Sequence, residues 1–344
     1  MNTFYNFSTG YNRLKNELLP KICIYDDENC EKKIVKAHSV QNNRILNSIS
    51  ENGEVLRFYH DSMSEELEVK ALAIGKKKAS TFSGFCKYHD MKIFQPIEIQ
   101  EYQSSNLEQQ FLFAYRAFSF DYYAKKYQST LFDKLFEVYS NHDSEFLKKY
   151  FKFEPPNTND FYNYYINYFG RLSEEAKDSF EQMEKLRVAF NTNLLKNRYY
   201  KIKTYEVRFN ERFEIAASGA PTVDYDLNGN MINDLPRLHS YLSFMFITVF
   251  PQKNNTVVLL SCTKNDIAKY NRFFKQIEQL SEERKRIVIS VLLVCYIENI
   301  YMSPRLWNCL DDSEKIYLEN IFHATIGNHP KELYNKLDFN IFIK

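Results

Sequence analysis

The chain has 344 residues, a formal net charge of +1 at pH 7, and 44% hydrophobic and 26% charged residues. This composition excludes a disordered chain, because the apolar content can form a core, and it excludes a basic surface over the whole chain. The longest largely apolar run, Ile287 to Ile297, is too short to span a bilayer, so we expect no membrane segment. The polar N-terminus has no apolar leader, which predicts a cytoplasmic protein with reduced cysteines.

Residues 21–100 contain three of the six cysteines and predict a small metal-binding unit. We expect a short strand over 33–37, a short helix within 39–50, and two strands at 54–59 and 69–74. The lysines at 76–78 predict a solvated basic turn. We then expect a tight turn at 82–85, followed by the start of a helix at the Cys86/His89 pair.

Residues 106–150 predict helices, because large apolar and aromatic side chains recur there at helical spacing in two stretches. Arg116 lies among these aromatics, and we expect its stem to pack against the core while its charge stays in water. The Pro155–Pro156 pair cannot continue a helix and marks a linker. We expect a short helix over 161–169 that ends at Gly170, and a separate helix capped by Ser173.

From about residue 200 the apolar period changes from helical to alternating. The pattern predicts antiparallel strands near 205–209, 213–217, 242–250 and 256–262, and then helices near 264–280, 282–302 and 312–324. Strands followed by helices indicate an α+β fold with a C-terminal antiparallel sheet packed with helices. We predict three regions, namely a zinc-binding unit at 1–105, a helical connector at 106–154 and an α+β domain at 155–344.

Four side chains have the types that tetrahedral zinc binds in structural sites. Cys23 and Cys30 precede the first predicted strand, and Cys86 and His89 form a C-x2-H pair at a predicted helix start. We therefore predict that these four residues hold a structural zinc ion. The alternative is that the thiols are ordinary buried side chains and that the histidine lies on the surface.

The order of these residues resembles the treble-clef zinc finger of the His-Asn-His (HNH) nuclease superfamily. In that family a cysteine pair precedes a strand that ends in a histidine, and a second Cys/His pair starts a helix. The resemblance implies that His38 is the general base, that Asp90 binds a catalytic Mg²⁺ or Mn²⁺ ion, and that Ser80 or Thr81 takes the Asn position. Ala37 stands where the family usually has an Asp or His that also binds this metal.

A second resemblance extends further along the chain, to about residue 126. The stretches 36–41, 79–90 and 111–117 are similar to those of uncharacterised bacterial proteins from phage-defence and mobile-element neighbourhoods. The resulting hypothesis is a metal-dependent endonuclease of anti-phage defence, acting on nucleic acid. The alternative is a non-catalytic, zinc-stabilised protein that binds a partner protein or phage component. His38 itself could be the base, a zinc ligand in place of Cys23, or a hydrogen-bonded polar residue.

Overall fold

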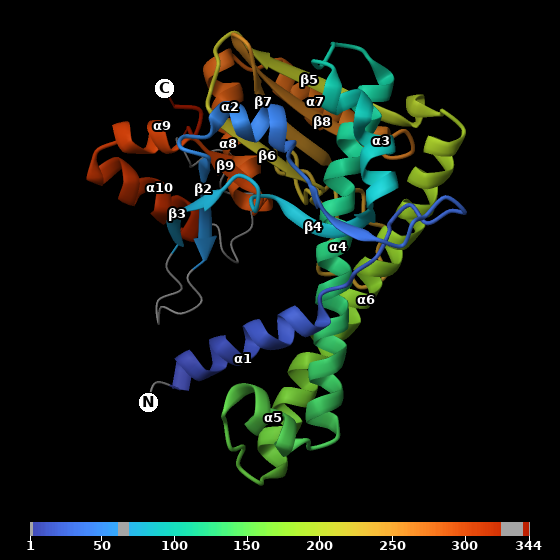
Figure 1. The fold of residues 1–344 in the computed structure, drawn as a ribbon, viewed down its shortest axis with the longest axis vertical. Coiled ribbons are helices and arrows are strands. Elements are labelled where there is room, and N and C mark those ends of the chain that lie inside the picture. Colours follow the sequence, from blue (N-terminus) through green and yellow to red (C-terminus); the bar gives the residue numbers. More distant parts are fainter. Residues whose placement is uncertain (1–2, 61–68, 325–339, 344) are drawn as a thin grey trace.

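The computed structural model describes residues 3–60, 69–324 and 340–343. These residues form a mixed α+β fold, with a large antiparallel sheet, a small two-stranded unit beside it, and two long helices that extend away from both (Figure 1). The predicted α+β class with a C-terminal sheet packed against helices is confirmed. Within the described residues, every helix is too short or too polar to cross a membrane.

The large sheet has seven strands in the order β3-β2-β9-β6-β7-β8-β5, and each neighbouring pair is antiparallel. The strands are β2 (Glu54–His60), β3 (Val69–Gly75), β5 (Ile202–Phe209), β6 (Ile215–Gly219), β7 (Phe246–Gln252), β8 (Asn255–Thr263) and β9 (Ile300–Met302). Both faces of the central strands are buried. Successive side chains of a strand point to opposite faces, so these strands contribute to two separate cores.

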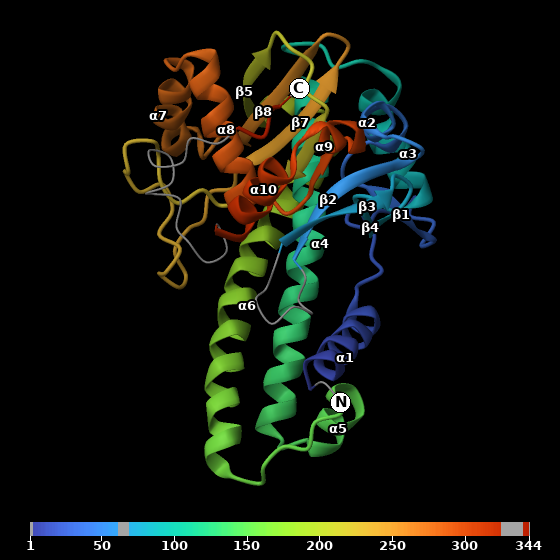
Figure 2. The same ribbon diagram turned by 90° about the vertical axis from the view of Figure 1, so that its left-hand side faces the viewer.

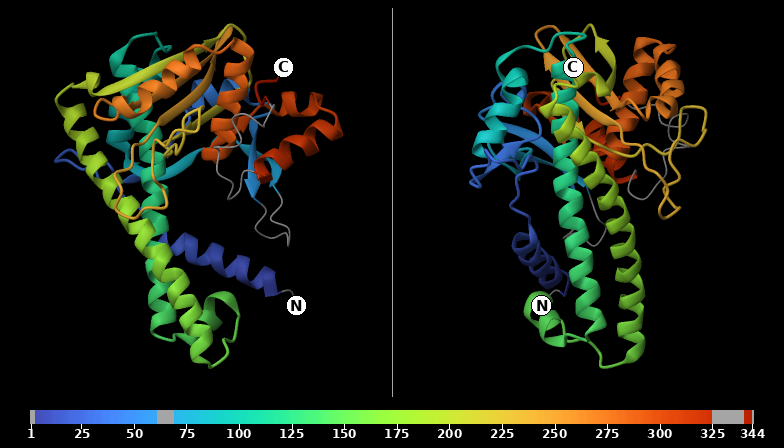
Figure 3. Two further views of the ribbon diagram at one scale, coloured as in Figure 1. Left: turned by 180° about the vertical axis from the view of Figure 1, so that it is seen from behind. Right: turned by 90° about the vertical axis from the view of Figure 1, so that its right-hand side faces the viewer.

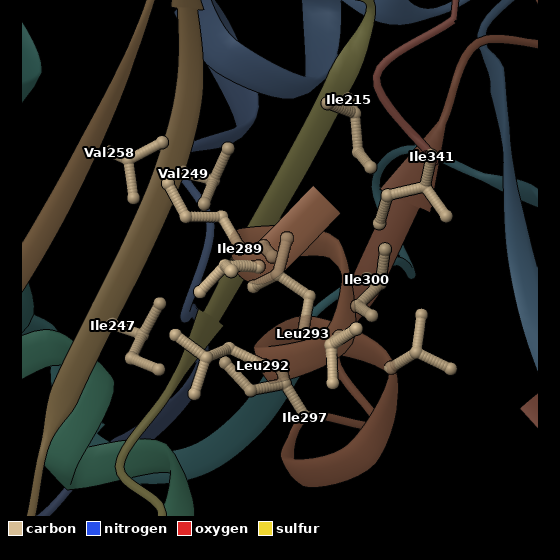
Figure 4. Packing of buried hydrophobic residues seen from close by; sticks show 14 of the residues in the cluster. Ile215, Ile247, Val249, Val258, Ile289, Leu292, Leu293, Ile297, Ile300 and Ile341 are labelled. Atoms are coloured by element: carbon tan, nitrogen blue, oxygen red, sulfur yellow. The ribbon is translucent and has the colours of Figure 1, made fainter. Parts of the chain in front are cut away.

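The first core lies between the sheet and the helices α7 (Ile267–Glu278) and α8 (Glu282–Tyr296). Ile247, Val249 and Val258 point from the sheet toward Ile289 and Leu293 of α8 (Figure 4). Such burial of branched aliphatic side chains contributes about 1.5–3 kcal/mol for each residue.

The second core covers the opposite face of the sheet and is rich in aromatic rings. Phe246 and Phe250 of β7 point into it, where α4 (Leu107–Ser140) contributes Tyr115 and Phe118. Phe190 of α6 (Asn159–Leu195) stacks on Phe118, with ring centroids 5.0 Å apart. The aromatic repeat at 107–122 therefore forms core, as its helical spacing indicates.

Helices α4 and α6 continue side by side well beyond the sheet (Figure 2). At their far end they meet α1 (Thr3–Leu18) and α5 (Ser144–Phe151), and a third core forms there around Leu14, Leu135 and Leu147 (Figure 3).

The two-stranded unit consists of β1 (Ile34–His38) paired antiparallel with β4 (Thr81–Cys86), followed by α3 (Lys87–Ile99). We call β1, β4 and α3 the ββα unit. The short π-helix η1 (Asn42–Leu46) and the short α-helix α2 (Asn47–Ile49) follow β1, within the range where a short helix was expected. The remaining elements are η2 (Tyr199–Lys201), α9 (Pro304–Cys309) and α10 (Asp312–Ala324).

Several predicted element boundaries are wrong. The expected turn at 82–85 is part of β4. The expected break at Gly170 is absent from α6, where Gly170 instead lets the Phe136 ring approach, since an added Cβ would lie 3.2 Å from it. Ser173 is a mid-helix residue that donates a hydrogen bond to Asp133 and caps nothing. The helix expected over 282–302 ends at Tyr296, because Ile300–Met302 pairs with β2 and β6.

The hairpin of β2 and β3 lies in the sequence between the two strands of the ββα unit. In space it belongs to the large sheet, where β2 pairs with β9. Residues on both sides of the predicted boundary at 105 therefore share one sheet and one aromatic core.

Candidate functional site

The four predicted metal ligands come together at the N-terminus of α3. One ligand atom from each of Cys23, Cys30, Cys86 and His89 lies within 4.8 Å of every other. Cys86 is the N-cap of α3, and its Sγ accepts the backbone N–H of His89 at 3.4 Å. The i, i+3 spacing thus places both side chains on the first helical turn.

The first two ligands reach the cluster because their segment runs along β4. The backbone N–H of Ile22 donates to the Ser83 carbonyl at 3.2 Å, and that of Ile24 donates to the Gly84 carbonyl at 2.9 Å. These bonds place Cys23 beside the end of β4. Cys30 then returns through a turn in which its N–H donates to the Asp27 carbonyl.

His89 presents its Nδ1 to the sulfurs, at 3.2 Å from Cys23 Sγ and 3.3 Å from Cys86 Sγ. The imidazole is 2% exposed, and its Nε2 lies 3.0 Å from Asp27 Oδ1 without forming a hydrogen bond to any described residue. A carboxylate behind a ligating histidine keeps the proton on the outer nitrogen and leaves the inner nitrogen free for a metal.

Protons on the sulfurs of Cys23 and Cys30 are hard to remove in this site. Burial raises the pKa of Cys23, and the neighbouring sulfurs of Cys86 and Cys30 raise it further. Burial also raises the pKa of Cys30. A cation would reverse this effect, because a thiolate bound to a metal is stabilised in its deprotonated form. Three sulfurs and one imidazole at these separations could therefore hold a metal ion.

His38 lies outside this cluster of ligands, at the end of β1. Its Nδ1 lies 3.0 Å from the Ala79 carbonyl oxygen and 3.4 Å from Ser80 Oγ. A carbonyl oxygen only accepts, so Nδ1 carries the proton and Nε2 keeps its lone pair. Burial lowers the pKa of His38, and the charge of Arg116 lowers it further, so the neutral imidazole predominates at pH 7.

Asp90, Phe94 and Glu98 lie on one face of α3, because each is four residues after the one before it. Arg116 of α4 packs against this face. Its Nη2 donates to Glu98 Oε1 at 2.7 Å, and its guanidinium carbon lies 4.2 Å from the Phe94 ring centroid.

The charges of Arg116 and Glu98 act on both predicted catalytic residues. Burial raises the pKa of Asp90, while the charge of Arg116 lowers this pKa and the charge of Glu98 raises it. The same two charges act in the same directions on the pKa of His38. We call His38, Asp90, Glu98 and Arg116 the polar cluster.

Arg116 differs from its prediction, because its charge is not in water. The residue is 2% exposed, and its Nε and Nη1 atoms make no hydrogen bond among the described residues. Neither Arg116 nor Glu98 was predicted to be part of a site. The available signal was the Asp90, Phe94 and Glu98 spacing, which places two carboxylates on one face of a helix.

The other positions implied by the HNH resemblance are also placed. Ser80 lies beside His38, as described above, while the Thr81 hydroxyl donates to the Lys78 carbonyl at 2.9 Å. Ala37 is 1% exposed and offers no side-chain ligand.

Comparisons with known proteins give no match to a family model, to a curated protein or to a solved structure.

Proposed function

We propose that this protein is a metal-dependent endonuclease of bacterial anti-phage defence, which hydrolyses phosphodiester bonds in DNA or RNA. The observation that carries the proposal is the 3.0 Å contact of His38 Nδ1 with the Ala79 carbonyl oxygen, which requires the proton to be on Nδ1. Its Nε2 is thereby prepared to accept a proton, which is what a general base requires.

In this proposal Cys23, Cys30, Cys86 and His89 bind a structural zinc ion. Zinc favours four ligands of these types in a closed tetrahedral site. It would tie the segment that precedes β1 to the start of α3. Asp90 directly follows His89, so the same ion would fix the position of the predicted catalytic carboxylate.

His38 would take a proton from the water that attacks phosphorus, through its Nε2 atom. Asp90 would hold a Mg²⁺ or Mn²⁺ ion, which when bound supplies positive charge for the scissile phosphate. Glu98 and Arg116 would keep the surroundings of both residues rigid. Lys77 and Lys78 are exposed in the turn just before Ala79, where their charges would attract the nucleic-acid backbone.

The test is a cleavage assay on plasmid DNA and on single-stranded RNA, with Mg²⁺ or Mn²⁺. We expect His38→Ala and Asp90→Ala to lower the initial rate by roughly a hundredfold or more, the usual contribution of a general base. His142→Ala is the matched control, because His142 stacks on Tyr162 at the far end of the long helices. Wild-type cleavage that persists in His38→Ala would exclude the proposed base.

A second candidate is a non-catalytic, zinc-stabilised protein that binds a partner protein or a phage component. Ala37 favours it, because this position lacks the metal-binding side chain usual in HNH nucleases. It predicts that wild-type protein cuts neither DNA nor RNA with either metal. It also predicts that the protein retains one specific phage component in a pull-down from infected cells.

A further inference from the structure

A large cavity lies on the face of α6 that points away from the metal ligands. On one face, Arg187 and Asn191 donate hydrogen bonds to the Ile24 carbonyl, beside Cys23. On the opposite face, Lys185 and Ala189 line a cavity of about 710 Å³. Its volume falls in the range of roughly 300–1,000 Å³ that is typical of small-molecule sites.

The loop 239–242 lines the cavity beside α6 and is held in place by hydrogen bonds to this helix. Gln182 donates to the Ser240 carbonyl at 3.0 Å and accepts the Leu242 N–H at 2.8 Å. Asp178 accepts the backbone N–H of His239 at 3.0 Å. The loop 239–242 is therefore fixed against α6, and the cavity is preformed.

Four cationic side chains line the cavity, namely Lys185, Arg198, Lys201 and Lys264. Three of them gather where α6 ends. The Lys264 N–H donates to the Lys201 carbonyl at 2.7 Å, and both ammonium groups lie 5.7 Å from the Tyr200 ring centroid. Among the described residues, none of the four forms an ion pair with a carboxylate.

The lining also contains three carboxylates, and among the described residues none of them forms an ion pair with the four cations. Asp266 is 3% exposed and accepts hydrogen bonds from three hydroxyls, those of Tyr241, Ser243 and Thr263. Asp178 accepts the backbone N–H of His239 and lies 3.2 Å from its Nδ1. Glu181 lies one helical turn before Lys185. The cavity therefore has more cationic than acidic side chains in its lining, four against three.

We propose that this cavity binds a nucleotide. The phosphates would contact Arg198, Lys201 and Lys264, since phosphate accepts strong charge-assisted hydrogen bonds from such groups. The base would pack on Tyr241, which is 62% exposed in the lining while its hydroxyl is anchored on Asp266 at 2.9 Å. The nucleotide could be free or the end of a single strand, and the two sources share this chemistry.

The test is isothermal titration calorimetry of the full chain with ATP, tripolyphosphate and a short 5′-phosphorylated oligonucleotide. We expect one ATP for each chain, bound roughly ten- to a hundredfold more weakly by the Lys201→Ala/Lys264→Ala variant. Lys196→Ala is the matched control, because Lys196 is exposed at the same helix end but does not line the cavity. Tyr241→Ala should weaken ATP and leave tripolyphosphate unchanged.

Each outcome decides the proposal. Binding of the oligonucleotide without ATP supports it and identifies a strand end as the source. If neither ligand binds at millimolar concentration, or if the double variant binds as the wild type does while its circular dichroism is unchanged, the proposal is wrong. The nuclease proposal is tested separately, because His38→Ala should bind ATP with wild-type affinity.

Discussion

The hydroxyl of Tyr301 accepts a hydrogen bond from the backbone N–H of Ser80 at 2.7 Å, across 221 positions of sequence. The same hydroxyl donates to Asn299 Oδ1 at 2.9 Å, and Asn299 Nδ2 donates to Ser39 Oγ at 2.9 Å. Strand β9 thereby holds the loop whose Ala79 carbonyl orients His38. The large sheet and the ββα unit are joined at the predicted catalytic base.

Tyr301→Phe removes one hydroxyl and leaves the buried Ser80 N–H without an acceptor. We expect the free energy of unfolding to fall by about 1–3 kcal/mol, the usual cost of an unsatisfied buried polar group. Urea denaturation measures this change. Tyr317→Phe, in an exposed position of α10, is the control and should change stability by less than about 0.5 kcal/mol. Equal effects of the two substitutions would contradict a structural role for the Tyr301 hydroxyl.

The proposed zinc site predicts one zinc ion for each chain by elemental analysis. Cys86→Ser should lose the zinc and lower the melting temperature, because a structural zinc site contributes directly to folding. Cys309→Ser changes an exposed free cysteine and should keep both properties. A chelator should lower the melting temperature of the wild type and of Cys309→Ser alike. Full zinc content in Cys86→Ser would remove Cys86 from the ligand set.

The lowered pKa of His38 predicts how stability depends on pH. The unfolded histidine titrates near its ordinary value of 6.5, and the folded one below it. Between these two pKa values the unfolded chain binds more protons than the folded chain. The free energy of unfolding therefore falls as pH drops through this window and is constant above it. His38→Asn keeps a donor for Ala79 but does not titrate.

The measurement for His38 is the free energy of unfolding of both proteins against pH. The wild type should lose stability relative to His38→Asn as pH falls below about 6.5, the ordinary pKa of histidine. An imidazole titration by NMR with a midpoint above that value would show that the site favours the charged form instead.

The pair of Arg116 and Glu98 predicts an asymmetry between its two partners. Glu98→Gln leaves the buried guanidinium without its anion and should lower the free energy of unfolding by about 1–3 kcal/mol. The loss is expected to be smaller than for a fully buried ion pair, because the Glu98 side chain is 39% exposed. Arg116→Met keeps an apolar contact with Phe94 and should cost less.

Denaturant titrations of both single variants and the double variant measure the coupling between Arg116 and Glu98. The exposed pair Lys134–Glu137 is the reference, with an expected coupling of about 0.3–0.5 kcal/mol. If the coupling between Glu98 and Arg116 is no larger than that of the reference pair, burial does not strengthen this ion pair.

The sequence was sufficient to predict that Cys23, Cys30, Cys86 and His89 come together in a cluster that could hold a metal ion, because sulfur and imidazole at a helix start form a local pattern. It was not sufficient for β9, because three residues are too few to show a period, and Ile300–Met302 becomes a strand only through pairing with β2 and β6. The buried charge of Arg116 was missed for a related reason. A long cation between aromatics usually extends into water, and only the contact with α3 shows that it does not.

The position of β2 and β3 has a consequence for anyone who wishes to cut this protein into parts. A fragment that stops near residue 105 would contain all four predicted metal ligands, yet β2 would lose β9, the strand that pairs with the edge opposite β3. Bare strand edges recruit other chains, so such a truncation should aggregate even when supplied with zinc. Expression of the intact polypeptide is therefore the sound starting point for biochemical work.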